Sequence, residues 1–445
     1  MRILIIGGVA AGTSAATEIR RQDKNAQIRI YERDTYISYA SCGMPFYISG
    51  EFTAFEDLVP RGPEFFLKKH NTEVLTSHEV EAIEPEKNKI RVKNLVSGEV
   101  FEDSYDALII ATGARAANPK IEGSEDERVF FMRNIGDLKA VKEYIDKKAP
   151  KKAAIIGSGL VGLEMCETFR ELGMETTLIS RSSLARGLDP EMTDIIEAHL
   201  KEKGVSLIKN AHSQRITKTG VTLKDLPAVD ADIVILATGV LPNTELAKAA
   251  GLKIGETGAI WVDSSMKTSV DNIYACGDCT EQRSIVTGKT LYRPMGSTAN
   301  KTGVVAGNNA AGGNQRFGGI LGTSIFRIFE LTAAQTGISQ QEAEKLGIDV
   351  VVSFDKRAAK PEYMGGRPMT VKTVAKRTSG RILGAQIVGY EGVDKRMDVL
   401  AAAISLNATA DDLTNIDFAY APPYSTPRDV LYYTGVKLKK AMENK

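Results

Sequence analysis

The sequence predicts an α/β protein in which two strand–helix–strand units are followed by a third, α+β unit. Apolar residues 3–6 lead into the glycine-rich stretch 7–12, an alanine-rich helical stretch through Arg21 and a second strand at 27–31. The pattern returns with apolar residues 153–156, the glycine-rich stretch 157–162, a helical stretch through Leu172 and a strand at 176–179. From about residue 319 the pattern changes to alternating strands such as 380–389, typical of an antiparallel sheet, with helical stretches between them.

Both glycine-rich stretches have the composition of dinucleotide-binding loops. Glycines let the backbone turn sharply and approach a pyrophosphate, whose charge then lies at the positive end of the following helix. The second copy reads Gly157-Ser158-Gly159-Leu160-Val161-Gly162, whereas Val9 replaces the middle glycine of the first. The alternative is two unrelated buried strands with convenient glycines, and the doubled context argues against it. We therefore expect two Rossmann-like dinucleotide-binding domains.

Three further phrases follow in a fixed order. Glu32 ends the second strand, Ala-Thr-Gly ends a strand at both 111–113 and 237–239, and Gly277-Asp278 ends the strand that begins at Asn272. This order resembles the two-dinucleotide-domain flavoprotein disulfide reductases, which bind FAD in the first unit and NAD(P)H in the second. The resemblance implies an FAD-binding domain at 1–112 and 243–318, an NAD(P)H-binding domain at 113–242, and a C-terminal dimerisation domain at 319–445 that forms a homodimer.

The resemblance also assigns cofactor contacts. Glu32 maps onto the ligand of the adenosine ribose, Asp278 onto the ligand of the ribityl chain, and Ser297 onto the start of a helix that points at the flavin. The residues expected to bind the two cofactors are Gly7, Gly8, Ala10, Ala11, Gly12, Glu32, Arg33, Ser41, Thr112, Gly113, Gly157, Gly159, Leu160, Val161, Gly162, Arg181, Thr238, Gly239, Gly277, Asp278, Ser297, Thr298 and Ala299.

The strand at 176–179 gives a hint about the nicotinamide cofactor. It is followed by Ser180-Arg181-Ser182-Ser183, without the acidic residue that would bind the ribose hydroxyl of NADH and repel a 2′-phosphate. Arg181 favours NADPH, or the use of both cofactors.

Cys42 is the candidate redox residue among four cysteines. It lies in Ser38-Tyr39-Ala40-Ser41-Cys42-Gly43-Met44-Pro45, a phrase that resembles the single-cysteine branch of the family: coenzyme A disulfide reductases, NAD(P)H persulfide or polysulfide reductases, NADH oxidases and NADH peroxidases. Its position at the start of a short helix predicts a lowered pKa and hence a reactive thiolate. The alternative is a small buried hydrophobic residue.

The other cysteines are assigned structural roles. Cys276 and Cys279 form a CxxC, the spacing of thioredoxin-like redox pairs and of half a zinc site. The βαβ setting of the redox pair is missing, no second pair or nearby histidine completes a metal site, and their Gly-Asp coincides with the FAD phrase. Cys166 is expected in the core. With four histidines and four irregularly spaced cysteines, we expect no metal site.

Histidines that this chain lacks reduce the set of candidate functions further. The resemblance places the histidine of NADH oxidases and peroxidases where this chain has Ala10, and the last histidine is His212. Coenzyme A disulfide reductases use tyrosines from the partner subunit instead, which implies catalytic roles for Tyr363 and Tyr420. Packing of Tyr420 in its proline-rich loop is the alternative.

Charge and composition restrict the partners. Lys+Arg is 57 and Asp+Glu is 56, so the net charge of +1 excludes a global field for nucleic acid or an anionic membrane. Neither a signal peptide nor an apolar stretch of roughly 20 residues is present, which predicts a cytoplasmic protein. A local basic cluster is expected to bind the phosphates of coenzyme A, with solvated surface charge as the alternative: Arg20, Arg21, Arg61 and Lys69.

The sequence therefore predicts a homodimeric FAD enzyme that uses NAD(P)H to reduce coenzyme A disulfide, persulfide or polysulfide through a Cys42 mixed disulfide. Coenzyme A is expected as a bound ligand or as the partner in that mixed disulfide. One alternative is an NADH oxidase that reduces oxygen through a Cys42 sulfenic acid. Another is a redox-sensing or electron-transfer flavoprotein. The physiological sulfur substrate and the choice between NADH and NADPH stay open.

Overall fold

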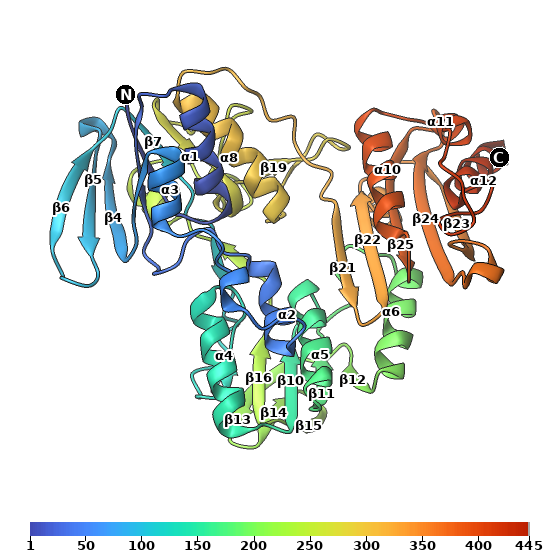
Figure 1. Ribbon diagram of the computed structural model, residues 1–445. Helices are drawn as coiled ribbons and strands as arrows, with labels where there is room; N and C mark the ends of the chain where they lie inside the picture. The colour runs from blue at the N-terminus through green and yellow to red at the C-terminus, as the bar shows by residue number, and fades with distance from the viewer. Residues whose placement is uncertain (444–445) are drawn as a thin grey trace.

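The computed structural model describes residues 1–443, which form three units (Figure 1). The predicted dimerisation domain extends two residues beyond the described part, to 445. The first unit is built on a parallel sheet of order β18-β7-β1-β2-β3. Its strands are β1 (Arg2–Ile6), β2 (Gln27–Tyr31), β3 (Thr72–Leu75), β7 (Ala107–Ile110) and β18 (Ile273–Ala275). β18 follows the whole second unit in sequence, yet it pairs with β7.

Two helices pack closely on this sheet. In α1 (Ala10–Gln22) and α8 (Gly296–Ala310), small residues allow the backbones to approach. A Cβ at Gly303 would lie 2.3 Å from the carbonyl oxygen of Ala11, and one at Gly307 would lie 2.4 Å from that of Ala15. The unit also contains α2 (Met44–Ser49), α3 (Pro63–His70), α7 (Glu245–Ala249), the antiparallel strands β4 (His78–Glu84), β5 (Lys89–Asn94) and β6 (Val100–Ser104), and the short pair β19 (Gln282–Arg283) and β20 (Thr290–Leu291).

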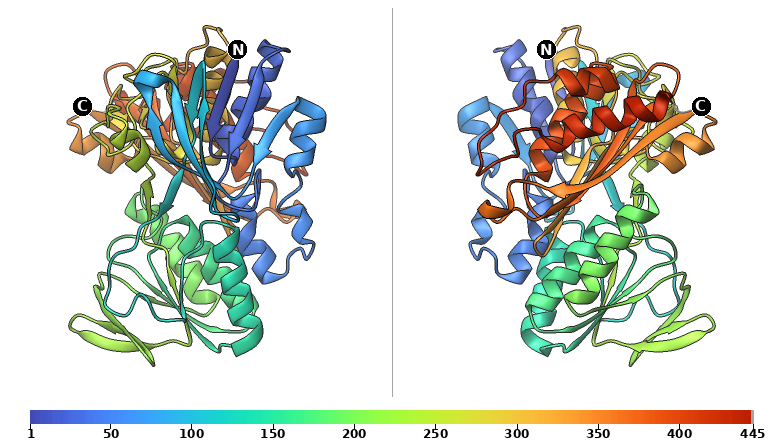
Figure 2. Two further views of the ribbon diagram at one scale, coloured as in Figure 1. Left: turned by 90° about the vertical axis from the view of Figure 1, so that its left-hand side faces the viewer. Right: turned by 90° about the vertical axis from the view of Figure 1, so that its right-hand side faces the viewer.

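The second unit repeats the architecture of the first. Its parallel sheet has the order β12-β11-β10-β16-β9, and the unit forms the lower end of the molecule in both views of Figure 2. The strands are β9 (Val129–Phe130), β10 (Lys152–Ile156), β11 (Glu175–Ile179), β12 (Val205–Ile208) and β16 (Ile233–Leu236), with helices α4 (Ile135–Lys148), α5 (Leu160–Glu171) and α6 (Pro190–Glu202). The chain enters and leaves through the antiparallel pair β8 (Ala114–Ala116) and β17 (Val240–Pro242).

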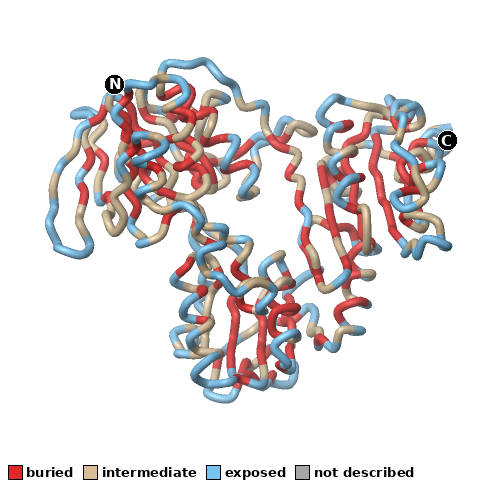
Figure 3. The backbone as a smooth tube through the Cα atoms, in the orientation of Figure 1, coloured by how far each residue is buried: buried red, intermediate tan, exposed pale blue. Residues whose placement is uncertain are grey.

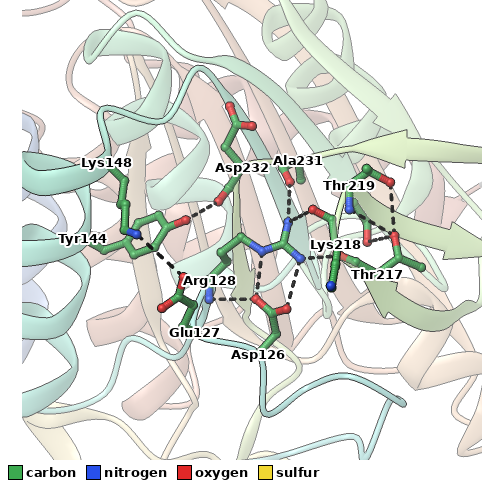
Figure 4. Close-up of polar contacts among 11 residues, drawn as sticks. Asp126, Glu127, Arg128, Tyr144, Lys148, Thr217, Lys218, Thr219, Ala231 and Asp232 are labelled. Atoms are coloured by element: carbon green, nitrogen blue, oxygen red, sulfur yellow. Dashed lines mark hydrogen bonds and ion pairs between the residues drawn. The ribbon is translucent and has the colours of Figure 1, made fainter.

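Arg128 fixes a small antiparallel sheet to this unit, as Figure 4 shows. Its guanidinium pairs with Asp126 at 2.8 Å and donates to the backbone carbonyl oxygens of Thr217, Lys218 and Ala231. The small sheet consists of β13 (Ser213–Thr217), β14 (Gly220–Leu223) and β15 (Leu226–Asp230). Every polar contact of Arg128 is therefore structural.

The third unit is an antiparallel sheet of order β21-β22-β25-β24-β23, which confirms the predicted change of architecture. Its strands are β21 (Ser324–Ile328), β22 (Leu331–Gly337), β23 (Val350–Ala358), β24 (Pro368–Lys376) and β25 (Ile382–Gly389). All eight residues of β25 are buried, because both faces of the sheet are covered. The helices are α9 (Gln340–Lys345), α10 (Val393–Ser405), α11 (Ala410–Asn415) and α12 (Val430–Glu443).

Each sheet carries its own buried core, drawn in red in Figure 3. The largest cluster crosses unit boundaries, since it joins Met44 of α2, Phe169 of α5 and Phe326 of β21. The predicted α/β class with two Rossmann-like units and an α+β unit is thus confirmed. No helix among residues 1–443 is long and apolar enough to cross a membrane.

Candidate functional site

The two glycine-rich loops have matching geometry. Gly7 (φ +105°) and Gly157 (φ +112°) both adopt a backbone conformation that favours glycine, and a Cβ on either would lie 2.2 Å from a carbonyl oxygen. Those oxygens belong to Ala111 and Ala237, the first residues of the two Ala-Thr-Gly phrases. The repeated phrase therefore has a physical reason, because it packs against the first glycine of its own loop.

The helices that follow these loops have N-termini suited to an anion. α1, α5 and α8 have neither a side-chain cap nor an acidic residue in the first turn. By contrast, α4, α9 and α11 are capped by Asn134, Ser339 and Thr409. Uncapped N–H groups and the positive end of the helix dipole fit the pyrophosphates of two dinucleotides and, at α8, an electron-rich ring.

Glu32 and Asp278 occupy positions that fit FAD. Glu32 is buried and accepts hydrogen bonds from the backbone N–H of Gly8 at 2.7 Å and of Asp34 at 2.9 Å. Burial raises the pKa of its carboxyl group. Asp278 is ion-paired with Arg133 at 2.7 Å through one carboxylate oxygen. In each carboxylate, acceptor capacity is left for a ribose or ribityl hydroxyl.

The second loop has room for a nicotinamide dinucleotide. A Cβ at Gly159 would meet no atom within 4 Å, so the loop is open where a phosphate would approach. Arg181 is exposed directly after β11, beside the buried Ser180, whose hydroxyl lies 2.6 Å from that of Ser158. Arg181 and the loop are thus on adjoining segments.

Cys42 lies at the junction of the three units. It belongs to a single 3₁₀ turn, Ser41–Gly43, that runs directly into α2. The residue is accessible to solvent, and its thiol lines a pocket of about 540 Å³ whose walls partly enclose it. The pocket is lined by Cys42, Phe46, Glu164, Ile325, Phe326, Arg327, Thr332, Tyr390, Glu391, Gly392, Val393 and Asp394. A pocket of this volume admits a small sulfur compound.

The prediction that the protein lowers the pKa of Cys42 is wrong for the groups of this chain. Burial, followed by the negative charge of Glu164, raises the pKa of the thiol, and Asp278 acts in the same direction. The hydroxyl of Ser41 and the guanidinium of Arg133 oppose this effect without reversing it. Burial and the two carboxylates together outweigh these two groups, a balance that the sequence does not reveal.

Three units meet through Arg327 at the wall of this pocket. The Arg327 guanidinium of β21 pairs with Glu51, which follows α2, and with Glu167 of α5 at 3.3 Å. It also lies 5.0 Å from the ring centroid of Phe46. The backbone N–H of Phe329 donates to Glu167 at 2.8 Å, so that carboxylate is held from two sides.

The remaining cysteines are structural, as predicted. Cys166, Cys276 and Cys279 are fully buried free thiols, and burial raises the pKa of each. Residues 1–443 contain no group of three or more His, Cys, Asp or Glu side chains that could hold a metal ion.

The basic cluster is gathered in space, with one correction. Arg21, Arg61 and Lys69 surround His70, and burial together with these cations lowers the pKa of that imidazole. Arg20 is not available to a phosphate, because its guanidinium donates to five backbone carbonyl oxygens. The prediction that Arg20 binds substrate is therefore wrong.

The two predicted catalytic tyrosines do not line the pocket of their own chain. Tyr363 is 75% exposed between β23 and β24, and Tyr420 is 49% exposed between α11 and α12. The tyrosine that does line the pocket is Tyr390, which sequence reasoning missed. Its ring lies 3.3 Å from the Arg367 guanidinium carbon and packs edge-on against His199. No motif marks Tyr390, since it reaches the pocket through the end of β25.

Two Rossmann-like units, glycine loops fitted to dinucleotides and one accessible cysteine define a flavin- and pyridine nucleotide-dependent oxidoreductase. The sequence matches the family described as pyridine nucleotide-disulphide oxidoreductase over residues 1–298 and its dimerisation domain over residues 323–429. The chain belongs to this family, whose cofactors are FAD and NAD(P)H.

Known relatives cover the chain over nearly its full length. The NAD(P)H sulfur oxidoreductase (CoA-dependent) of Pyrococcus furiosus is 39% identical, over 98% of this chain and 99% of the relative. The structure of reduced Bacillus anthracis CoADR-RHD is 36% identical with a TM-score of 0.97, and covers 99% of this chain and 80% of that one. The structure of an engineered water-forming NADPH oxidase, a mutant of the NADH oxidase of Lactobacillus brevis, is 28% identical with a TM-score of 0.94. It covers 100% of this chain and 99% of that one. Its substitutions include consecutive Asp-Ala-Met to Ala-Arg-Ser.

Proposed function

We propose that this protein is a homodimeric FAD enzyme that uses NAD(P)H to reduce the disulfide, persulfide or polysulfide of coenzyme A through Cys42. The observation that carries the proposal is the single accessible thiol in a 540 Å³ pocket, with the other three cysteines buried elsewhere. The Pyrococcus furiosus relative, named for sulfur and CoA, supports the same substrate class.

The residues of this chain would bind FAD and carry out the sulfur chemistry in the following way. Gly7, Gly8 and the N-terminus of α1 would bind the pyrophosphate of FAD, Glu32 its adenosine ribose and Asp278 its ribityl chain. Bound FAD would supply two-electron transfer from NAD(P)H. The Cys42 thiolate attacks the S–S bond of the substrate, releases one thiolate and forms a mixed disulfide, whose reduction by two electrons releases the second thiolate.

We assign coenzyme A binding to Arg21, Arg61 and Lys69, whose charges would meet its phosphates. Because Tyr363 and Tyr420 lie outside the pocket of their own chain, we place them in the site of the other subunit. There, Tyr363 of the partner subunit and Tyr420 of the partner subunit would steady the departing thiolate.

NADPH is the favoured co-substrate. Ser180-Arg181-Ser182 follows β11 with no acidic residue, and the engineered NADPH oxidase carries Ala-Arg-Ser at three consecutive positions. The Arg181 side chain would pair with the 2′-phosphate of NADPH.

The test compares electron acceptors. NADPH oxidation is measured without oxygen in the presence of coenzyme A disulfide or polysulfide, and then with oxygen alone. We expect the sulfur substrates to be reduced faster and a coenzyme A adduct on Cys42 in protein isolated without reductant. Oxygen consumption that outpaces every sulfur reaction, together with an oxygen adduct on Cys42, would favour the oxidase. The likeness to a water-forming oxidase supports that second candidate.

A further inference from the structure

The two tyrosines assigned above to the site of the other subunit lie on loops of the third unit. Tyr363 belongs to residues 359–367 between β23 and β24, here called the Tyr363 loop. Tyr420 belongs to residues 416–429 between α11 and α12, here called the Tyr420 loop. Both side chains are exposed, so their own packing does not fix where they point. Groups that act on a substrate from loops need a rigid support elsewhere in the fold.

One buried guanidinium contacts both loops. Arg396 lies on α10, which packs on β22 and β25 (Figure 1), and its side chain is 3% exposed. It donates to the carbonyl oxygen of Ala359, the first residue of the Tyr363 loop, at 3.0 Å. It also pairs at 2.7 Å with the carboxylate of Asp429, the last residue of the Tyr420 loop. A third contact, to the carbonyl oxygen of Gly392 at 3.1 Å, keeps the guanidinium at the start of its own helix.

Asp429 passes this contact on towards Tyr420. The hydroxyl of the fully buried Ser425 donates to Asp429 at 2.9 Å, and the backbone N–H of Ser425 donates to the carbonyl oxygen of Ala421 at 3.1 Å. Ala421 directly follows Tyr420. Burial opposes ionisation of Asp429, but Arg396 outweighs burial and lowers the pKa of the carboxyl group. The Tyr420 loop is therefore held on a charged, buried pair.

The Tyr363 loop is fixed at both ends to the segment that leads into α10. Lys360 pairs with Glu391 at 2.7 Å, and the guanidinium carbon of Arg367 lies 3.3 Å from the ring centroid of Tyr390. The backbone N–H of Ala359 donates to the carbonyl oxygen of Arg367 at 3.0 Å and closes the loop. The segment 390–396 thus supports both tyrosine loops, and Arg396 is the side chain of this segment that contacts the two together.

We propose that Arg396 is a positioning residue for the site of the other subunit. It fixes the two loops relative to each other and thereby places Tyr363 and Tyr420 at the partner subunit's Cys42. The inference rests on the proposed function, and it adds a buried residue that acts through two others. Loss of this support impairs Cys42 of the other chain and spares Cys42 of the same chain.

The informative substitution is Arg396→Lys. Lysine keeps a cation beside Asp429, whereas a neutral residue would leave that buried carboxylate unpaired and destabilise the fold. A single ammonium does not reproduce the rigid fork of donors that reaches Ala359 and Asp429 together. In the homodimer we expect kcat with coenzyme A disulfide or polysulfide to fall about 10-fold or more, with flavin reduction by NADPH unchanged. Arg377→Lys, in an exposed pair with Asp349 at 3.0 Å, is the matched control and should turn over normally.

Hybrid dimers show on which chain Arg396 acts. Each hybrid is assembled from two differently tagged chains, of which one carries Cys42→Ser, so only the Cys42 of the other chain works. With Arg396→Lys on the Cys42→Ser chain, the working Cys42 receives its tyrosines from the altered loops, and turnover should fall about 10-fold or more. With Arg396→Lys on the chain of the working Cys42, turnover should equal that of a hybrid of Cys42→Ser with the wild type.

Two further variants are placed in the same two arrangements. Tyr363→Phe reports directly which chain's cysteine the tyrosine acts on, and it should impair the Cys42 of the other chain. Asp429→Asn removes the ion pair while it keeps the shape of the side chain, and it should show the same preference for the other chain. It decides the question independently if Arg396→Lys dimers do not assemble.

The outcomes separate the inference from the proposed function. A loss confined to the Cys42 of the substituted chain, or equal in the two arrangements, would overturn the inference, because a merely structural role acts on its own chain. Normal turnover of both Arg396→Lys hybrids would overturn it as well. Tyr363→Phe that impairs its own chain would refute the placement of the tyrosines and the inference with it. Failure of the wild type to reduce any sulfur substrate would instead refute the proposed function.

Discussion

Single side chains decide which charges the two cofactors and the substrate meet. Arg181 is exposed and stands where an acidic residue would exclude a 2′-phosphate. Arg20 has the same charge, but its guanidinium donates hydrogen bonds to five backbone carbonyl oxygens. Equal formal charge therefore does not mean equal availability to a phosphate.

Arg181→Ala should raise the KM for NADPH and leave that for NADH nearly unchanged. A hydrogen bond to a charged group contributes about 1.5 to 3 kcal/mol, which corresponds to roughly 10-fold or more in kcat/KM. Steady-state kinetics with both nicotinamides measure the effect, and Lys201→Ala, whose side chain pairs with Glu197 on α6, is the control. Equal losses of kcat/KM with NADPH and with NADH would show that Arg181 does not bind the 2′-phosphate.

At the scale of elements, close packing of α1 on α8 sets the position of two helix N-termini. Gly303 leaves no room for a Cβ, because the carbonyl oxygen of Ala11 lies only 2.3 Å from its place. Backbone atoms cannot move aside as the end of a flexible side chain can. The two helices therefore depend on glycine at this contact.

Gly303→Ala should destabilise the protein by about 1 to 3 kcal/mol, the usual cost of overpacking, and weaken FAD binding. Urea unfolding measures the first effect and flavin retention on dilution the second. Gly318→Ala is the control, since a Cβ there meets nothing within 4 Å. A Gly303→Ala protein as stable as the control would contradict the packing argument.

The elements that follow local rules were predictable. The glycine-rich loops and both Ala-Thr-Gly strands carry their geometry in consecutive residues. The wall of the Cys42 pocket was not predictable, because Glu164, Arg327 and Tyr390 come from three segments that only tertiary packing joins. The pKa of Cys42 was mispredicted for the same reason, since burial and then the charge of Glu164, from another unit, raise it.

At the scale of the whole molecule, a buried ion pair joins the second and third units. Lys372 of β24 lies 2.9 Å from Asp189, the residue before α6, and both side chains are almost fully buried. Asp189 also accepts from the backbone N–H groups of Gln340 and Gln341 at the start of α9. This network holds the second unit against the sheet of the third unit.

Lys372→Met should destabilise the protein by about 3 kcal/mol or more, because Asp189 would remain buried without its cation. Asp189→Asn added to Lys372→Met should restore part of the loss, since the amide keeps an acceptor for α9 and carries no charge. Lys376→Met, exposed on the same strand, should change little. Chemical denaturation measures all three, and a Lys372→Met protein as stable as the Lys376→Met control would disprove the role of the pair.

The account depends most on Cys42 as the one cysteine that exchanges electrons with the substrate. The direct measurement is Cys42→Ser, with Cys279→Ser as the matched control for a buried thiol. The Cys42→Ser protein should bind FAD and be reduced by NADPH at the wild-type rate, yet give no turnover with coenzyme A disulfide or polysulfide. Sulfur turnover that persists in Cys42→Ser would contradict the central claim.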